Sequence, residues 1–397
     1  MRLKVEFLVL LALCACRKDI EVFLPEVEKV GTPEVLVDSS EAKWAHFLPE
    51  YKNIQGFYLL NEGNMGSNKA TLDYYDYAAG EYTRNIYGNA NPGVTKEMGD
   101  VGNDLAIYGD RLYAVINASN KVEVMNRHTA ERIGQVEIPN CRYIRFHGAY
   151  AYVTSYAGPV VITPNYEQKG YVAKLDTATL QVVAMCVVGH QPDGIEIVGE
   201  KMYVANSGGY MVPNYENTVS VIDLEAFTEV KRIEVAVNLH HLQADNHGQL
   251  WVTSRGDYYN TPSKLYCINL QTNELTDSID VPVTGFWLDG DSLYIYGSAW
   301  SNITMEDEVS YAIVDVGKHK IVSRNFITDG TEQNIRKPYG VAVNPLTKDI
   351  YVTDAKNYVN PGTLYCFGKD GQKRWSVRTG DIPAHIVFLG ELKQQQP

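Results

Sequence analysis

The stretch Met202-Tyr-Val-Ala-Asn206, an aromatic and β-branched run followed by a long polar segment, recurs along the chain. Seven copies align on their ring: Phe57-Tyr-Leu-Leu-Asn61, Leu112-Tyr-Ala-Val-Ile116, Ala151-Tyr-Val-Thr-Ser155, the stretch at 202–206, Leu250-Trp-Val-Thr-Ser254, Leu293-Tyr-Ile-Tyr-Gly297 and Ile350-Tyr-Val-Thr-Asp354. The aligned rings lie roughly 40 to 57 residues apart, which is the period of a four-stranded propeller blade and not of a helical solenoid. The repeat therefore predicts an all-β, seven-bladed β-propeller.

Each repeat divides into four short strands. Around Tyr203, alternating β-branched residues mark strands at 193–198, 201–206, 218–223 and 229–235, as expected for half-buried antiparallel strands. The chain starts the ring in a second strand and ends with Ala384-His-Ile-Val-Phe-Leu389, which matches a first strand. We therefore expect residues 384–389 to pair with residues 56–61, because this closes the ring and removes two open sheet edges. The propeller is expected to span residues 53–391, with a tail at 392–397.

The first sixteen residues are typical of an export signal. Arg2 and Lys4 precede an apolar run that is too short to cross a bilayer, and Leu13-Cys-Ala-Cys16 ends it. That ending resembles a bacterial lipobox, which implies cleavage before Cys16 and lipidation of its thiol. An ordinary secretory signal cut nearby is the alternative. Residues 17–52 show little strand periodicity and are expected to be a tether.

The net charge narrows the class of binding partner, and the cysteine positions indicate whether disulfides support the fold. The net charge of −13 argues against nucleic acid, which needs a basic stripe, and against docking on anionic lipid by charge. Cys267 and Cys366 occupy equivalent positions in two repeats, so they should lie on different blades, too far apart to bridge. Together with Cys141 and Cys186 they are expected to be buried thiols.

Loop lengths separate the two faces of the predicted disc. Connections from first to second and from third to fourth strands are short, with glycine and aspartate in the turns. Connections from second to third strands are long, and two blade-to-blade connections are long as well. These segments emerge on one face, named here the long-loop face: 62–69, 156–170, 207–217, 255–263, 298–308 and 355–362, with 88–102 and 328–337. Long loops on a rigid scaffold are where binding residues collect.

The long loops repeatedly place tyrosine beside asparagine. Aromatic rings give large contact area with few rotors to freeze, and asparagine adapts its hydrogen bonds, a mixture typical of ligand-binding faces. We predict that the ligand contacts are Met65, Tyr166, Tyr210, Tyr215, Arg255, Tyr258, Tyr259, Trp300 and Tyr358, with His241 at the channel. The alternatives are that the rings pin the loops to the blade rim, and that Arg255 forms a loop salt bridge instead of meeting a ligand phosphate or carboxamide.

Histidines offer a second class of function. Four of them fall at or near the start of first strands, which line the axial channel: His190, His240, His241 and His385. Histidines around an axis can bind a metal or act as acid and base, as in a lyase or hydrolase. Convergence of His190, His241 and His385 is the feature that favours an enzyme. No spacing matches a zinc or hydrolase signature, so we predict no metal, no cofactor and no catalytic residue. Asp104 and Asp193 are interpreted as strand-start caps.

Several stretches carry a resemblance to known propellers. Those that resemble the YncE-type seven-bladed propellers are Pro192-Asp-Gly-Ile195, Val204-Ala-Asn206 and Thr218-Val-Ser-Val-Ile-Asp223. Leu59-Leu-Asn-Glu-Gly-Asn64 with Ala70-Thr-Leu-Asp-Tyr-Tyr75 is similar to the subfamily called DUF5074, over roughly residues 55–390. Members of that neighbourhood include surface lipoproteins that capture cobalamin and pass it to a TonB-dependent transporter. The resemblance implies a lipid-anchored protein of the outer membrane, at the cell surface, with a corrinoid as first ligand. A glycan or a protein partner is the alternative.

Overall fold

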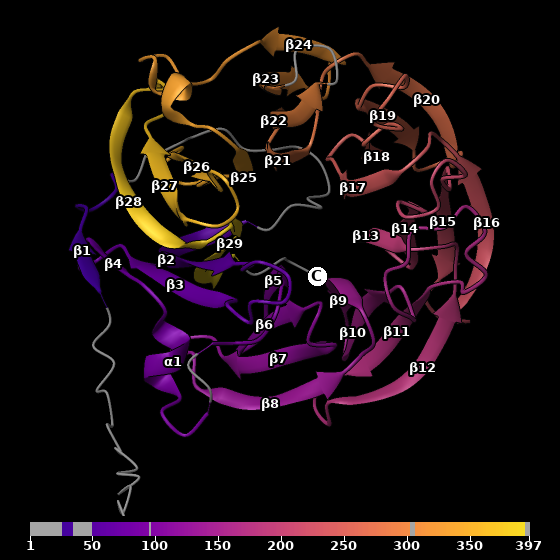
Figure 1. Cartoon of the computed structure of the whole chain (residues 1–397), viewed down its shortest axis with the longest axis horizontal. Helices are drawn as coiled ribbons and strands as arrows, with labels where there is room; N and C mark the ends of the chain where they lie inside the picture. Colours follow the sequence, from indigo (N-terminus) through magenta and orange to yellow (C-terminus); the bar gives the residue numbers. More distant parts are fainter. Residues whose placement is uncertain (1–25, 35–49, 95–96, 302–305, 394–397) are drawn as a thin grey trace, which may run out of the picture.

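Seven antiparallel sheets stand around a central axis in the computed structural model of the chain (Figure 1). The structure describes residues 26–34, 50–94, 97–301 and 306–393. The predicted seven-bladed propeller is confirmed. The export signal at 1–16 with Cys16, most of the predicted tether, and residues 394–397 lie outside the described residues.

Each blade has its first strand nearest the axis and its fourth strand at the rim. Blade one is formed by β29 (Pro383–Leu392), β2 (Tyr51–Asn61), β3 (Thr71–Asp76), β4 (Glu81–Thr83) and an extra outer strand, β1 (Val27–Lys29). The strands of blades two to four are β5 (Gly102–Tyr108), β6 (Arg111–Ile116), β7 (Lys121–Asn126), β8 (Arg132–Glu137), β9 (Cys141–His147), β10 (Tyr150–Ser155), β11 (Tyr171–Asp176), β12 (Gln181–Val187), β13 (Pro192–Val198), β14 (Lys201–Asn206), β15 (Thr218–Asp223) and β16 (Thr228–Glu234). Those of blades five to seven are β17 (Leu239–Ala244), β18 (Gln249–Ser254), β19 (Lys264–Asn269), β20 (Glu274–Ile279), β21 (Gly285–Asp289), β22 (Ser292–Ser301), β23 (Glu306–Asp315), β24 (Lys320–Ser323), β25 (Pro338–Val343), β26 (Ile350–Asp354), β27 (Pro361–Phe367) and β28 (Lys373–Asp381).

The C-terminal strand closes the ring, as the sequence predicts. In the β2–β29 ladder Gly56 lies opposite Leu389, Phe57 opposite Phe388, and Leu60 opposite His385. The N-terminal side of the same blade carries a strand that the sequence did not predict. Within the segment expected to be a tether, β1 pairs with β4 and places Val27 opposite Thr83. Three residues are too few to show strand periodicity, so only the structure reveals that this segment covers the rim of blade one.

The repeated ring explains why the blades pack. Seven buried apolar clusters lie in the structure, and each joins residues of two neighbouring blades. Six of the seven aligned rings are at most 1% exposed: Tyr58, Tyr113, Tyr152, Tyr203, Trp251 and Tyr351. A large ring at the same place in each second strand fills the space between adjacent sheets. The recurrence that identifies the fold in the sequence is therefore its core.

The prediction of one long loop is wrong. The strand repeat predicts a long second-to-third connection at residues 298–308, yet β22 and β23 continue through most of that segment. Ser298 lies opposite Val309 and Trp300 opposite Asp307, so cross-strand pairing overrides the loop-like composition. The predicted contact Trp300 thus sits on a strand, and its side chain lies outside the described part of the structure. Helix α1 (Ile86–Ala90) overlaps the start of the blade-to-blade connection at 88–102, and the short 3-10 helix η1 (Thr331–Asn334) lies within the one at 328–337.

The four cysteines of the propeller are free and buried, as expected. Over the described ranges, neither helix has the length and apolar character needed to cross a membrane.

Candidate functional site

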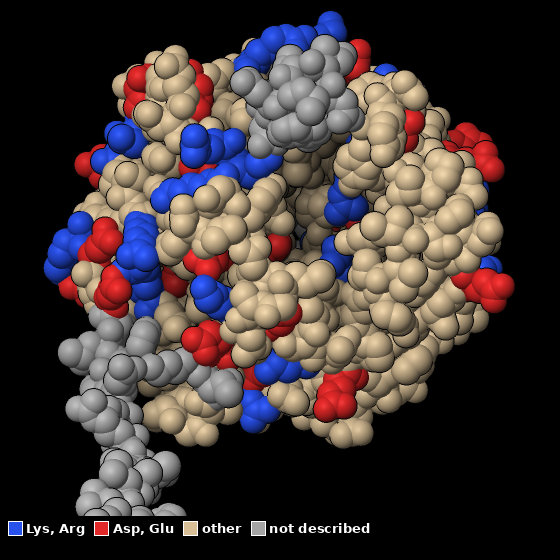
Figure 2. All heavy atoms as spheres, viewed as in Figure 1, with Lys and Arg blue, Asp and Glu red and all other residues tan. Residues whose placement is uncertain are grey.

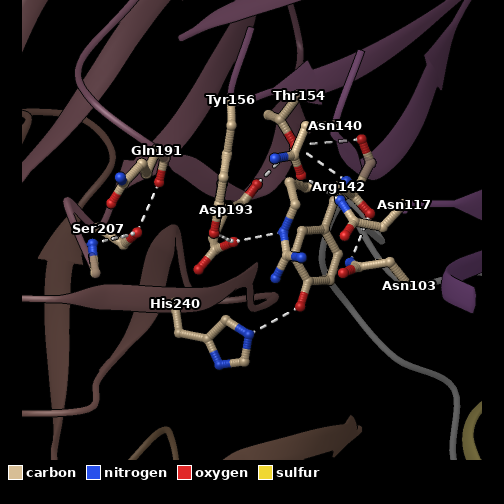
Figure 3. A network of polar contacts seen from close by, with 12 residues as sticks. Asn103, Asn117, Asn140, Arg142, Thr154, Tyr156, Gln191, Asp193, Ser207 and His240 are labelled. Carbon is tan, nitrogen blue, oxygen red and sulfur yellow. Dashed lines mark hydrogen bonds and ion pairs between the residues drawn. The ribbon is translucent and has the colours of Figure 1, made fainter. Parts of the chain in front are cut away.

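The inner strands have irregular starts at the long-loop end of the channel. Six of the seven shift register there against their second strands: β5, β9, β13, β17, β25 and β29. Such bulges insert residues into the ladder and re-aim their side chains. Three of the inserted residues, Arg142, Asp193 and His240, belong to one polar network at this end of the channel, named here the channel mouth (Figure 3).

A glycine allows the inner strands to come close enough for this network. A Cβ atom on Gly194 would lie 2.5 Å from the backbone oxygen of His240, inside any normal contact distance. Only glycine therefore permits β13 and β17 to approach at this point. The Asp-Gly pair at 193–194 thus combines a charged side chain with the close strand approach that buries it.

Asp193 is the centre of the network. Its carboxylate is fully buried and accepts hydrogen bonds from Arg142 Nε at 3.0 Å, Arg255 Nη1 at 2.8 Å and the Tyr156 hydroxyl at 2.7 Å. The Arg142 side chain is 15% exposed and the Arg255 side chain 25% exposed. Both arginine side chains therefore stay partly accessible at the channel mouth.

The charge of this cluster is unbalanced. Burial by itself disfavours the Asp193 carboxylate, but Arg142, Arg255 and the hydrogen bonds of Tyr156 and Arg255 outweigh burial and hold its pKa below the usual value. With Asp193 ionised, two guanidinium groups share one carboxylate. The cluster carries one net positive charge within an acidic protein. Figure 2 shows a hollow at the centre of the ring with Lys and Arg atoms on its wall.

Aromatic and imidazole rings surround the cluster. Arg142 lies over the Tyr156 ring at 4.9 Å, and Tyr156 contacts Tyr210 with ring centroids 6.4 Å apart. The Tyr143 hydroxyl is 2.8 Å from His240 Nε2, and the rings of His240 and His241 lie 3.7 Å apart. Burial and the nearby Arg255 lower the pKa of His241 to about 3 and also lower that of His240. Both imidazoles are therefore neutral at physiological pH and add no charge to the mouth.

Three buried polar atoms next to the cluster have no hydrogen-bond partner among the described residues: Gln191 Nε2, Asn238 Oδ1 and His240 Nδ1. Gln191 and Asn238 use their other amide atoms, on Tyr210 N at 2.7 Å and Gly256 O at 3.0 Å. A buried polar atom without a partner costs stability, so such atoms mark places where water or a ligand completes the bonding.

The other side of the mouth holds a carboxylate and a cation. Glu62 accepts a hydrogen bond from the Tyr339 hydroxyl at 2.9 Å and lies 3.1 Å from His385 Nε2. Lys337 lies over the Tyr358 ring at 5.4 Å. Blades one and seven hold this group, and blades three to five hold the arginine pair, so a ligand across the channel meets both kinds of charge (Figure 1).

Two long loops share one rigid conformation. The Asp257 side chain accepts hydrogen bonds from the backbone of Tyr259 and Asn260, and Asn357 does the same for Val359 and Asn360. The residue after Asp257 and the residue after Asn357 both have a positive φ, 64° at Tyr258 and 65° at Tyr358. These turns leave Tyr259 76% and Val359 65% exposed. Side chains held outward by internally bonded turns are preorganised for contact.

The predicted contact residues divide into three groups. Arg255 and Tyr210 adjoin the network, with His241 beside it. Tyr166 and Tyr215 donate their hydroxyl groups to Pro159 O and Asp257 O, as expected for rings that pin loops. Met65, Tyr258 and Tyr259 are 66%, 55% and 76% exposed, and Tyr358 is 36% exposed. Arg255 does form the ion pair considered as an alternative, but with an inner strand and not with its own loop. Ligand contact by these residues stays a prediction.

The histidines do not form a three-residue centre. His190 pairs with Glu216, His385 pairs with Glu62, and the ring of His241 lies tilted against that of His240. Within the described residues no three His, Cys, Asp or Glu side chains are grouped to hold a metal ion.

Sequence reasoning missed the role of Asp193, which was interpreted as a strand cap, and did not single out Arg142, Tyr156 or Glu62. A signal existed for Arg142, which stands with Arg145 inside the otherwise apolar run Cys141-Arg-Tyr-Ile-Arg-Phe146. Charges in such runs are rarely buried unless they are paired.

Comparison with known proteins supports the same fold. The family model described as a domain of unknown function, DUF5074, matches residues 55–377. A quinonprotein alcohol dehydrogenase-like protein from Bacteroides thetaiotaomicron is similar in structure, with 14% identity, a TM-score of 0.59, and coverage of 84% of this chain and 78% of that chain. Hydrazine synthase from Kuenenia stuttgartiensis has 15% identity, a TM-score of 0.54, and coverage of 68% and 77%. Apo AztD from Citrobacter koseri has 12% identity, a TM-score of 0.50, and coverage of 87% and 100%.

These identities are low, so the three structures carry information about the fold alone. No curated protein matches the chain significantly. The family model spans most of the propeller, from β2 to β28, and the chain belongs to the DUF5074 family.

Proposed function

We propose that the protein is a non-enzymatic binding protein, lipid-anchored at the outer cell surface, that holds a corrinoid at the channel mouth for delivery to a TonB-dependent transporter. One observation carries the ligand part of this proposal: Arg142 and Arg255 share the single buried carboxylate of Asp193, and both side chains stay partly exposed. This arrangement gives a fixed, incompletely neutralised cation pair, which suits a ligand with an anionic group.

The remaining features of the mouth suit the rest of a corrinoid. Its carboxamide arms are both donors and acceptors, and the exposed side-chain amides of Asn165 and Asn260 on the long loops offer both. Its phosphate suits the arginine pair. Its flat ring suits the exposed side chains of Tyr258 and Tyr259 on the rigid loop that follows Arg255. Anionic, amide and flat apolar groups thus have complementary partners on one face.

The anchoring part rests on the sequence before the described residues. Cys16 ends the export signal, and the described chain starts at Glu26, whose backbone oxygen accepts a hydrogen bond from Arg84 N. A lipid on Cys16 would therefore hold the propeller through the rim of blade one, at the strand β1.

Isothermal titration calorimetry with cyanocobalamin tests the ligand assignment. The proposal predicts saturable binding with one ligand per chain. If millimolar cyanocobalamin gives no heat of binding and competes with no other ligand of the protein, the corrinoid assignment is contradicted. Binding to a member of a glycan panel at the same face would then establish the alternative ligand class.

A pair of tyrosine variants tests whether ligand contact and loop anchoring are separate roles. Tyr259 is largely exposed, so Tyr259→Ala should weaken corrinoid binding by about 1 to 3 kcal/mol and leave the melting temperature unchanged. Tyr215 is bonded to the neighbouring loop, so Tyr215→Ala should lower the melting temperature. Equal binding by wild type and the Tyr259 variant would remove the exposed loop from the site.

A further inference from the structure

The rim of blade three has an apolar edge away from the channel mouth. Its outermost strand, β12, pairs with β11 on one side and is the last strand of its sheet (Figure 1). The side chains of Val183, Met185 and Val187 alternate along β12 and are 54%, 59% and 60% exposed. None of the seven residues of β12 is charged.

The other blades guard their outer edges. Blade one is covered by β1, and the outermost strands of the remaining blades all carry charged side chains. These are Arg132 and Glu137 in β8; Glu229, Lys231, Arg232 and Glu234 in β16; Glu274 and Asp277 in β20; Lys320 in β24; and Lys373, Arg374, Arg378 and Asp381 in β28. Charge on an edge strand opposes pairing with another strand, and β12 lacks this protection.

A β-bulge does not protect β12 from edge pairing in place of the missing charge. All six uncovered outer strands shift register once or more against their neighbours, so this device is common to them. In β12 the shift lies next to Val183 and leaves a regular ladder from Ala184, opposite Lys174, to Val187, opposite Tyr171. Half of the strand is therefore flat enough to accept another strand on its free side.

We propose that β12 is a self-association edge, which pairs antiparallel with β12 of a second copy of this chain and joins two blades into one eight-stranded sheet. A two-fold axis through Cys186 centres the contact on the regular half of the strand. It also places the exposed side chains of both copies on the same face of the joined sheet. Met185 then lies opposite Val187 of the partner subunit, twice. Because β12 is uncharged, two copies of it can pair without placing like charges opposite each other. The outer strands of the other blades carry charges that can meet like charges in such a pair.

The contact is small. One short edge strand covers less than the roughly 800 Å² per partner that stable interfaces bury, so the dimer is weak and depends on concentration.

Sedimentation equilibrium of the full chain carrying Cys16→Ser, which has no lipid, tests the edge. The average mass should rise from monomer towards dimer as the concentration increases through the micromolar range. Met185→Lys should weaken self-association at least tenfold without changing the melting temperature, because the added charge lies opposite the apolar Val187 of the partner subunit and diagonal to its own copy. Val230→Lys is the matched control, since Val230 is 58% exposed on the charged outer strand β16, and it should leave association unchanged.

Cross-linking tests the register. Both variants carry Cys186→Ser, because Cys186 lies opposite its own copy on the axis and is a free thiol. In that background a mixture of Met185→Cys and Val187→Cys chains should form a disulfide-linked pair under mild oxidation, and each variant alone should do so far less, because only the mixture places two thiols opposite. A wild type that stays monomeric throughout the range, or a dimer that survives Met185→Lys, overturns the proposal. So does equal cross-linking of the mixture and of each variant alone.

Discussion

Replacing Asp193 with asparagine keeps the shape of the central side chain and removes the charge that holds Arg142 and Arg255 together. The Asp193 carboxylate is fully buried and accepts from both guanidinium groups and from Tyr156. Asparagine leaves two cations beside a neutral amide whose own N–H groups face donors. Removing one partner of a buried ion pair costs about 3–5 kcal/mol. Because Arg142 and Arg255 are partly exposed to water, we expect the lower end, about 3 kcal/mol.

The assay is urea unfolding of wild type and Asp193→Asn, followed by circular dichroism between pH 3 and pH 7. The folded pKa of Asp193 lies below its unfolded value, so its stabilisation is present above about pH 4 and is lost as the pH falls through the folded pKa. The difference between wild type and variant should therefore shrink below pH 4. Asp223→Asn is the control, since Asp223 accepts a backbone hydrogen bond in an exposed turn. A variant within 1 kcal/mol of wild type at pH 7, or a difference independent of pH, would refute this account of the network.

Three further perturbations follow from the fold and its charges. A chain that ends at Pro383 loses most of β29 and reopens two sheet edges, so its melting temperature should fall by about 10 °C or more, and an unchanged melting curve would argue against ring closure. Burial, opposed by Arg145, raises the pKa of Glu196 to about 6. The free energy of unfolding should therefore fall by up to about 2 kcal/mol as the pH rises from 4.5 through 6. In urea unfolding, Glu196→Gln should be more stable than wild type at pH 7.5 by up to that amount and equally stable at pH 4.5. Cys16→Ser should move the folded protein from the membrane to the soluble fraction, and persistence in salt-washed membranes would contradict lipid anchoring.

The fold was predictable because the aromatic core residue of each blade recurs at a similar spacing in the sequence. A ring such as Tyr203 or Trp251 stands at the same place in each second strand, and the structure buries it between blades. Ring closure was predictable for a related reason: residues 384–389 have the pattern of a first strand, and only one blade lacked one. The strand β1 was not predictable, because three residues show no period. The extension of β22 was also missed, since Trp300 lies in a polar segment that pairing alone makes a strand.

The network at the channel mouth could be predicted only in part. Arg255 was singled out because a cation stood among rings in one loop. Its partner, Asp193, lies on another blade, and nothing in the chain order indicates that β13 and β17 bring the two together. The bulges that re-aim Arg142 and His240 depend on the ladder between two strands, which single-strand patterns do not contain.

The central claim, that the arginine pair receives the anionic group of a corrinoid, is tested most directly by a two-by-two calorimetric titration. Wild type and Arg255→Gln are each titrated with cyanocobalamin, which has a phosphate, and with cobinamide, which lacks it; Arg127→Gln, at a short turn, serves as the control. We predict that Arg255→Gln weakens cyanocobalamin binding by about 1 to 3 kcal/mol and cobinamide binding by much less, because only the first ligand loses a charge-assisted contact. Equal losses for both ligands, or no loss for either, would contradict the claim.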